Sequence, residues 1–450
     1  MALTTHSTAR DLTTMLLRTP APLLLSAGAI GACLLSWFVL PFHPAVALAA
    51  CFMVSSVLYA AFAFSLGKYE LSARSLSLLL AGAMILRLCF LWTTPVGSDD
   101  FYRYIWDGRV QAAAINPYAH APNDPALRSL HTEAIPTRVN HPEFRTLYFP
   151  LSLWMFYLSY ELSGEMIWGY KLMLLLAECA TVLGLVLLLR ARAIEAKYVL
   201  LYALCPLPMV QFAIDAHLDG LGLPFLVFGI LLYYRKKPFA SALLLGLSMS
   251  IKPVALVLLP VLFFRTERWK EKMLYIIIPL AAVLLPFLPY TISAQPFDAI
   301  LAFAKNWTFN GAVFEVINAF VANNQQSRLI CAGILTAALL VLYAQKRMET
   351  HDMLYYAALL LFLCSPVVHP WYVNWLAVLV PLARRASGIA YLAMVSLAVY
   401  TSTLYILTGR WEQPALLLAV EYIPVIGLFA WEMLRFARSR GKHAPEIRTV

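Results

Sequence analysis

The sequence predicts an all-α polytopic membrane protein, a bundle of about 12–14 transmembrane helices. Its 450 residues are 61% hydrophobic and only 13% charged, and the mean hydropathy is +0.73. Apolar runs recur from end to end, each near or slightly below the ~20 residues that cross a bilayer. A polar stretch, 93–147, interrupts them, and a short aromatic run at 148–163 follows it. We expect a long external loop and a re-entrant or interfacial helix there.

The net charge of +10 is distributed in a way that reflects topology rather than nucleic-acid binding. Lys and Arg lie in short segments between the apolar runs, and such segments remain on the cytoplasmic side. These segments carry Arg10 and Arg18; Lys68 and Arg74; Arg190, Arg192 and Lys197; Arg235, Lys236 and Lys237; Arg265, Arg268, Lys270 and Lys272; Lys346 and Arg347; Arg384 and Arg385; and a basic tail from Arg435 to Arg448.

Keeping every basic segment inside fixes the path of the first half of the chain. Met1–Thr19 is polar and shows no cleavage site, so the run at 21–41 is a permanent span. Spans at 45–66 and 76–92 then place the loop 93–147 outside. The run 148–163 cannot cross, because Arg190 would then lie outside. The inward span is therefore 168–190.

The second half continues this alternation. Spans at 198–214 and 220–234 enclose an external turn, and 238–264 is broken at Lys252-Pro253 into arms of about 18 Å, too short to cross. The break therefore lies at depth, in protein or a wet cavity. The remaining expected segments are a span at 273–290, an external loop at 291–326, a span at 327–345, a hairpin with His369 at its outer turn, and spans at 388–408 and 415–434. Both termini are then inside.

The cysteines and glycines exclude several classes of site. All seven cysteines lie inside apolar runs, which predicts neither a disulfide framework nor a zinc site. Walker and dinucleotide glycine patterns do not occur, and no soluble stretch is long enough for a nucleotide-sugar fold. We expect no metal and no cofactor.

The external loop holds the densest chemistry. Asp99 and Asp100 follow a span directly, and one carboxylate of such a pair can accept a proton from a sugar hydroxyl, while each raises the pKa of the other. The alternative is a pair of ordinary acids on a solvated loop. Aromatic and basic neighbours that can stack a sugar or bind phosphate favour the site, and we expect sugar or acceptor binding by Tyr102, Arg103, Trp106, Asp107, Asn116 and Tyr118.

Further candidates lie at the outer ends or breaks of spans. Cations at Arg87 and Lys252 are costly within a membrane and suit a phosphate, although either can also be structural. His369 is a phosphate donor or a helix cap, and Glu178 is a functional or a buried structural carboxyl. The expected phosphate ligands are Arg87, Arg109, Lys252 and His369; the expected sugar or acceptor contacts at the other turns are Asp215, His217, Asp219, Trp371 and Tyr372.

These motifs resemble the C-type (GT-C) glycosyltransferases, and most closely the polyprenol-phosphate-mannose-dependent mannosyltransferases. The resemblance rests on Ser-Asp-Asp-x-Tyr-Arg-Tyr-x-Trp-Asp-Gly-Arg at 98–109, Asn-Pro-Tyr at 116–118, Tyr-Phe-Pro-Leu at 148–151, the Lys-Pro break, and His-Pro-Trp-Tyr at 369–372. It implies that an acid of the first large external loop is the catalytic base, and that sugar passes from a lipid-phosphate donor with inversion. That role falls on Asp99, with Asp100 as the second candidate.

The resemblance also implies a domain organisation. We expect one integral membrane domain over 1–450, with two extra N-terminal helices in 1–75, a GT-C-like core in 76–385, and C-terminal helices with a basic cytoplasmic tail in 386–450. Tyr-Phe-Pro-Leu stands where the family has Tyr-Pro-Pro-Leu.

The sequence therefore predicts a membrane hexosyltransferase, with mannose as the expected sugar. Its partners would be a polyprenyl-phosphate-linked sugar, a lipid or glycan acceptor and membrane lipids, and its active site would face the outside or lumen. Two alternatives stay open at this point. A lipid or glycolipid transporter would also have broken helices and buried charges, and a polymerase or ligase of lipid-linked glycans would share the location.

Overall fold

The computed structural model describes residues 21–133 and 135–441, so the predicted polar segment 1–19 and the end of the basic tail lie outside the described residues. The described part is helical, with one isolated parallel bridge between Phe309 and Val367. This agrees with the predicted all-α polytopic class.

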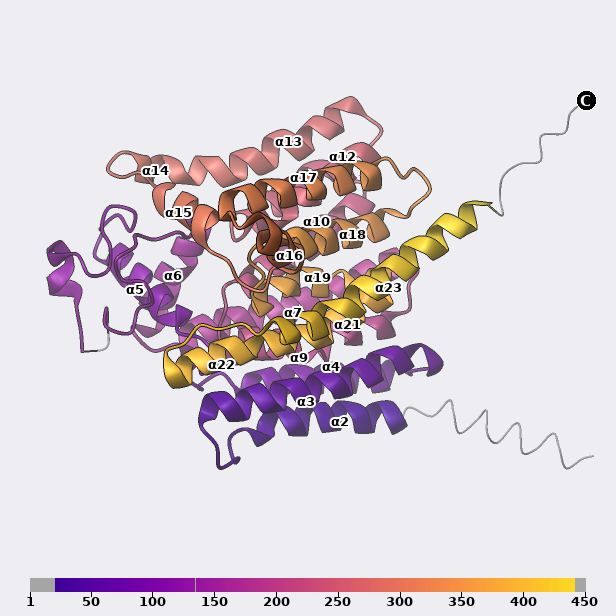
Figure 1. Cartoon of the computed structure of the whole chain (residues 1–450), viewed down its shortest axis with the longest axis horizontal. Coiled ribbons are helices and arrows are strands. Elements are labelled where there is room, and N and C mark those ends of the chain that lie inside the picture. Colours follow the sequence, from indigo (N-terminus) through magenta and orange to yellow (C-terminus); the bar gives the residue numbers. More distant parts are fainter. Residues whose placement is uncertain (1–20, 134, 442–450) are drawn as a thin grey trace, which may run out of the picture.

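Among the described residues, the first half of the chain forms helices α2 to α12, most of which are labelled in Figure 1. They are α2 (Ala21–Ser36), α3 (Pro44–Ser65), α4 (Ala73–Cys89), α5 (Asp100–Ala112), α6 (Pro150–Ser163), α7 (Trp168–Ala191), α8 (Leu200–Ala203), α9 (Pro206–Pro208), α10 (Asp219–Tyr234), α11 (Pro238–Met249) and α12 (Leu259–Arg265).

The second half adds the helices that pack around and over them. They are α13 (Trp269–Leu284), α14 (Leu288–Thr291), α15 (Asp298–Asn306), α16 (Ala312–Val321), α17 (Asn324–Tyr343), α18 (Thr350–Cys364), α19 (Asn374–Ala377), α20 (Val380–Ala383), α21 (Ala386–Met394), α22 (Val399–Thr408) and α23 (Ala415–Gly441).

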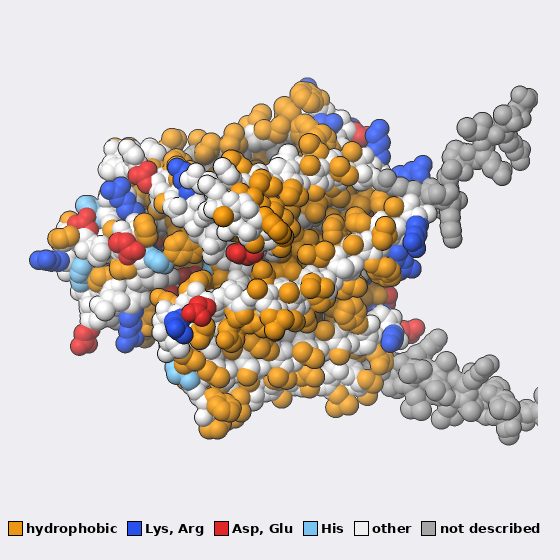
Figure 2. All heavy atoms as spheres, viewed as in Figure 1, with side chains coloured by type: hydrophobic (Ala, Val, Ile, Leu, Met, Phe, Trp, Pro, Cys, Tyr) orange, Lys and Arg blue, Asp and Glu red, His pale blue; other side chains and the backbone are white. Residues whose placement is uncertain are grey.

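Six helices of the described residues are long and apolar enough to cross a membrane, or up to seven if one bent pair is a single span. Six more apolar helices have 10–17 residues. The expected number of crossings is therefore reached only if shorter helices also cross. Hydrophobic side chains cover the middle of the molecule, while charged side chains gather toward its two ends (Figure 2).

Two segments differ in detail from the predicted span at 198–214 and the predicted external loop at 93–147. The segment 198–214 is not one helix, because α8 and the Pro206–Ile214 segment are bent by 46°. Pro206 has no N–H and forces Cys205 into an extended conformation, which ends α8. The second difference is in the polar loop 93–147, which contains the 13-residue helix α5.

The predicted break at Lys252-Pro253 is present. Helix α11 ends at Met249, Lys252 is extended with φ −154° and ψ 134°, and a 3₁₀ turn follows over Pro253–Val257. The residue before a proline avoids the α conformation, which explains the extended backbone. The break places the Lys252 side chain at an interruption rather than on a continuous helix.

Helices α5 and α6 form the polar end of the molecule, and Gly108 sets their distance. A Cβ at this position would lie 2.4 Å from the carbonyl oxygen of Phe156, so only glycine permits the approach. The rings of Tyr104 and Phe156 stack at 4.6 Å beside it. The connections α3–α4, α12–α13 and α17–α18, which carry predicted cytoplasmic basic segments, lie at the opposite end (Figure 1).

We expect the two ends to face opposite sides of the membrane. In a background without the seven native cysteines, a cysteine at the exposed position Ala112 should react with an impermeant thiol reagent added outside, because α5 lies at the end without the basic segments. A cysteine at the exposed position Arg347 should react only after permeabilisation. Labelling of both positions from one side would contradict the threading.

Candidate active site

The acid pair lies at the start of α5 and is bridged by one amide. Asp99 directly precedes the helix and Asp100 is its first residue. The side-chain nitrogen of Asn140 donates to Asp99 Oδ1 at 3.2 Å and to Asp100 Oδ1 at 2.7 Å. Both carboxylates therefore approach the same donor, although Asn140 is 40 residues further along the chain.

The segment 138–146 reaches the acids because it runs back along α5. Arg103 donates to the carbonyl of Phe144 at 2.9 Å and to Asp107 at 3.1 Å. Asp107 also accepts a hydrogen bond from Thr146 at 2.6 Å. Residues 103 and 107 are one turn apart on the helix, so they fix the return segment along one face.

The turn before the acids is held by Asp215. Its Oδ1 accepts hydrogen bonds from the backbone nitrogens of Val96 and Gly97 at 3.2 and 2.8 Å. A Cβ at Gly97 would lie 2.5 Å from Asp215 Oδ2, so a larger residue here would displace the carboxylate. Burial raises the pKa of Asp215, although the nearby His217 opposes the rise. Asp215 therefore positions the acid-bearing turn.

A stack of aromatic rings extends from Asp100 into the C-terminal half. His217 Nδ1 lies 3.4 Å from Asp100 Oδ2. The His217 ring stacks on Trp371 at 3.7 Å, and Trp371 stacks on His369 at 4.3 Å. His369 in turn stacks on Phe309 at 4.7 Å. His217 is 1% exposed, and neither ring nitrogen has a hydrogen-bond partner among the described residues.

Lys252 lies beside this stack, because it covers the ring of Tyr372, which contacts His369 and Trp371. Its Nζ donates to both oxygens of Asp219, at 2.9 and 3.0 Å, and lies 3.3 Å from the centre of the Tyr372 ring. Asp219 is fully buried and also accepts a hydrogen bond from Trp375 at 2.6 Å. The ammonium of Lys252 also interacts electrostatically with the carboxylate of Asp100. The structure thus brings Asp99, Asp100, His217, Lys252, Asp219, His369, Trp371 and Tyr372 together.

The two acids have different environments. Burial and then the charge of Asp100 raise the pKa of Asp99 above its ordinary value. Burial also raises the pKa of Asp100, but the interactions with His217, His369 and Asn140 together outweigh it, and the net pKa is lowered. Burial lowers the pKa of His369 to about 3, so its ring is neutral near pH 7. Separated pKa values are typical of acids with separate roles.

Several other predicted ligands instead hold the polar end together. Tyr118 donates to the carbonyl of Tyr148 at 2.6 Å, and Trp106 is buried. Asn116 donates to the carbonyl of Tyr290 at 2.9 Å. Arg109 pairs with Glu165. For Trp106, Asn116, Tyr118 and Arg109, the expected role in ligand binding stays a prediction.

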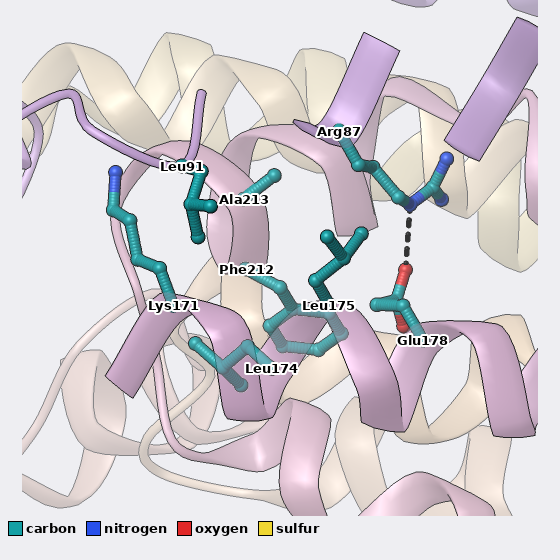
Figure 3. A pocket seen from close by; sticks show the side chains of 8 residues that line it. All are labelled: Arg87, Leu91, Lys171, Leu174, Leu175, Glu178, Phe212 and Ala213. Atoms are coloured by element: carbon teal, nitrogen blue, oxygen red, sulfur yellow. Dashed lines mark hydrogen bonds and ion pairs between the residues drawn. The ribbon is translucent and has the colours of Figure 1, made fainter. Parts of the chain in front are cut away.

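Arg87 belongs to a second, separate group of charges (Figure 3). Its Nε donates to Glu178 at 2.9 Å, and its Nη1 donates to the carbonyls of Ala83 and Ala203. Tyr202 donates to the other oxygen of Glu178. Arg87 and Glu178 are 2% and 1% exposed. The pair joins α4, α7 and α8, and this supports the structural alternative for both residues.

A small cavity separates the Arg87 pair from Lys171. Leucines and Phe212 line most of it (Figure 3). Lys171 donates to the carbonyls of Phe90 and Thr93 at 3.1 and 2.6 Å, which closes the outer end of α4 onto α7. Among the described residues, no group of three His, Cys, Asp or Glu side chains could hold a metal ion.

Sequence reasoning missed two residues of the site. Asn140 lies in a polar stretch with no periodic pattern, and only the return of the chain along α5 brings it to the acids. Trp375 belongs to an apolar run and contacts Asp219 from the other half of the protein. The proximity of Trp375 to the His-Pro-Trp-Tyr motif at 369–372 was the only available signal.

A family model described as alpha-(1→6)-mannopyranosyltransferase, N-terminal domain, matches residues 20–267, more than half of the chain. No curated protein and no solved structure matches the chain. The matched region includes the acid pair, Asn140 and Lys252, and it ends before His369.

We expect the Arg87–Glu178 pair to act on stability. Glu178→Gln leaves a buried cation without its counter-ion and should destabilise the protein by about 3–5 kcal/mol. Replacing both residues by Met should restore much of the loss, because the uncompensated charge is gone. Thermal unfolding in detergent measures both effects.

The control for this pair is Glu271→Gln, which removes one partner of the exposed Arg268–Glu271 pair. It should change stability by less than about 1 kcal/mol. If Glu178→Gln unfolds at the same temperature as the wild type, the buried pair does not stabilise the packing of α4, α7 and α8.

Proposed function

The chain belongs to the MptA_B family of alpha-(1→6)-mannopyranosyltransferases, and on this basis we propose that it transfers mannose from a polyprenyl-phosphate donor to a lipid or glycan acceptor. Membership makes the protein a mannosyltransferase of the membrane. We propose four further points beyond this membership: the donor, the acceptor, the stereochemistry and the side of the membrane.

The observation that carries the proposal is the bridged acid pair beside a cation and a neutral imidazole. Asp99 is the more exposed acid and has the raised pKa, so it suits the role of general base. It removes the proton of the acceptor hydroxyl as that oxygen attacks the anomeric carbon. The new C–O bond forms while the bond from the anomeric carbon to the phosphate oxygen breaks, and the polyprenyl phosphate leaves with the electron pair.

Lys252 and His369 are the proposed contacts for the leaving phosphate. Lys252 supplies positive charge, and the neutral ring of His369 can donate a hydrogen bond without a charge. Asp219 holds the ammonium in place until a phosphate oxygen shares it. Arg87 and Arg109 are not proposed as phosphate contacts, because their guanidinium groups form ion pairs with Glu178 and Glu165.

The proposed stereochemistry follows from the linkage in the family description. Inversion at the anomeric carbon that gives an α-(1→6) product requires a β-linked donor and a primary 6-hydroxyl as the acceptor. A single base and no nucleophilic intermediate suffice for such a displacement. The exposure of Asp99 at the polar end is consistent with approach of the acceptor from the aqueous side.

The proposed side of the membrane is the outer or lumenal one. Helix α5, which the acid pair begins, lies at the end opposite three basic connections (Figure 1), and basic connections remain in the cytoplasm. Nucleotide sugars are not supplied on the outer side, so a membrane-borne donor fits this location.

Replacement of the base is the direct test. With labelled polyprenyl-phosphate mannose and purified protein, Asp99→Asn should lower turnover by about 10²–10⁴, since the amide keeps the shape but cannot accept the proton. Asp100→Asn should be milder, because Asp100 acts on its neighbour. The reverse order would exchange the two roles, and full transfer by the double variant would refute the acid mechanism.

Replacement of Lys252 tests the phosphate contact. Lys252→Ala should raise the KM for the donor more than that for the acceptor, and Lys252→Arg should restore it only in part, because guanidinium is a planar fork rather than a point charge. Lys236→Ala, at an exposed basic connection, is the control. If Lys252→Ala lowers the stability of the protein and leaves the KM for the donor unchanged, the role of Lys252 is structural.

A further inference from the structure

Asn140 contacts both acids, and the proposed transfer mechanism gives it no role. Its side-chain nitrogen carries two hydrogens, and the two nearest acceptors belong to the two acids, at 3.2 and 2.7 Å. The opposite orientation would aim the amide oxygen at two carboxylates and is electrostatically unfavourable. The amide is thus a donor matched to a pair of neighbouring anions.

The backbone around Asn140 is fixed on both sides. Arg138 donates to the hydroxyl of Tyr102 on α5 at 3.0 Å. His141 packs its ring edge-on against Trp307 at 4.7 Å, and its backbone has a φ of +47°. A non-glycine residue with positive φ persists where the surroundings impose it, and such residues cluster at functional sites. Asn140 is therefore placed by the fold.

We propose that Asn140 is a positioning residue of the transfer reaction, whose amide bridges Asp99 and Asp100 and keeps both carboxylates ionised side by side. The inference rests on the proposed function and adds a residue to it. Two adjacent carboxylates repel each other, and each would otherwise favour protonation of the other. A shared donor offsets that repulsion and orients the Asp99 oxygen that faces the acceptor.

The other groups around the pair do not replace this donor. Asp99 faces Asp100 and His141, and His141 is exposed. The groups that face Asp100 from the packed elements are His217, His369, Lys252, Tyr104, Tyr148, Tyr170 and Tyr372. Among the described residues, Asn140 alone forms a side-chain hydrogen bond to both acids.

The pH profile of kcat/KM tests the inference, because it reports the pKa of the base in the free enzyme. Loss of the donor raises that pKa, so the base is protonated over a wider range and activity is lost at low pH and recovered as pH rises. In Asn140→Ala the acidic limb should move up by roughly 0.5–1 unit. In Asn140→Asp, which keeps the shape and adds a third carboxylate, it should move further.

Asn123→Asp is the matched control. Asn123 is exposed, and its backbone nitrogen bonds to the carbonyl of Pro142, two residues from Asn140. Among the described residues, its side chain forms no hydrogen bond with either acid, so the variant makes the same charge change in the same segment without removing the bridge and should keep the acidic limb close to that of the wild type. The profiles should cover about pH 4–8, which spans ordinary carboxyl and imidazole pKa values. Thermal unfolding of each variant shows that it is folded.

The outcomes separate the two proposals. If the acidic limb of the kcat/KM profile lies at the wild-type pH in both Asn140 variants, Asn140 is not a positioning residue, whether or not turnover is lower. If Asn140→Ala does not fold, the isosteric Asn140→Asp decides alone. Full turnover of Asp99→Asn instead refutes the base assignment itself, whatever the Asn140 variants do.

Discussion

The ion pair between Lys252 and Asp219 joins the break after α11 to the start of α10. Asp219 begins α10, and Lys252 lies where the α11–α12 segment is broken. Neither charge could be buried alone, since an unpaired ion in a low-dielectric interior is costly. Trp375 adds a hydrogen bond to the carboxylate and Tyr372 covers the ammonium. One polar contact therefore ties the helix break to the start of α10 and to the turn that carries the ring stack.

This arrangement explains why the acids differ. Asp100 is turned toward His217 and the interior, where its charge has partners, whereas Asp99 is exposed and adjacent to a charge of the same sign. A carboxylate with fewer favourable partners is the better proton acceptor, because its protonated form is less disfavoured. The sequence Asp-Asp carries no such asymmetry. The asymmetry arises because Asp100, the first residue of α5, approaches His217, whereas Asp99 precedes the helix and is exposed.

Hydropathy and charge in the sequence were enough to predict the all-α class, the break at Lys252-Pro253 and the polar segment that holds the acids. These features follow from local rules: apolar run length, proline geometry and charge between runs. Contacts between distant segments do not follow from such rules. Asn140 and Trp375 reach the site only through tertiary packing, and Arg87 has the same sequence signature as a phosphate ligand although its partner is Glu178.

The site also depends on residues beyond the region that the family model matches. Residues 20–267 supply the acids, the bridging amide and Lys252, whereas His369, Trp371 and Tyr372 come from the C-terminal half. The stack from His217 through Trp371 to His369 crosses that boundary. His217 stacks on Trp371 and lies 3.4 Å from Asp100, so a ring of the C-terminal half packs directly against the histidine that faces the acid pair. The candidate site is therefore built from both halves: the N-terminal region contributes the acid pair and Lys252, and the C-terminal half contributes His369 and the rings beside it.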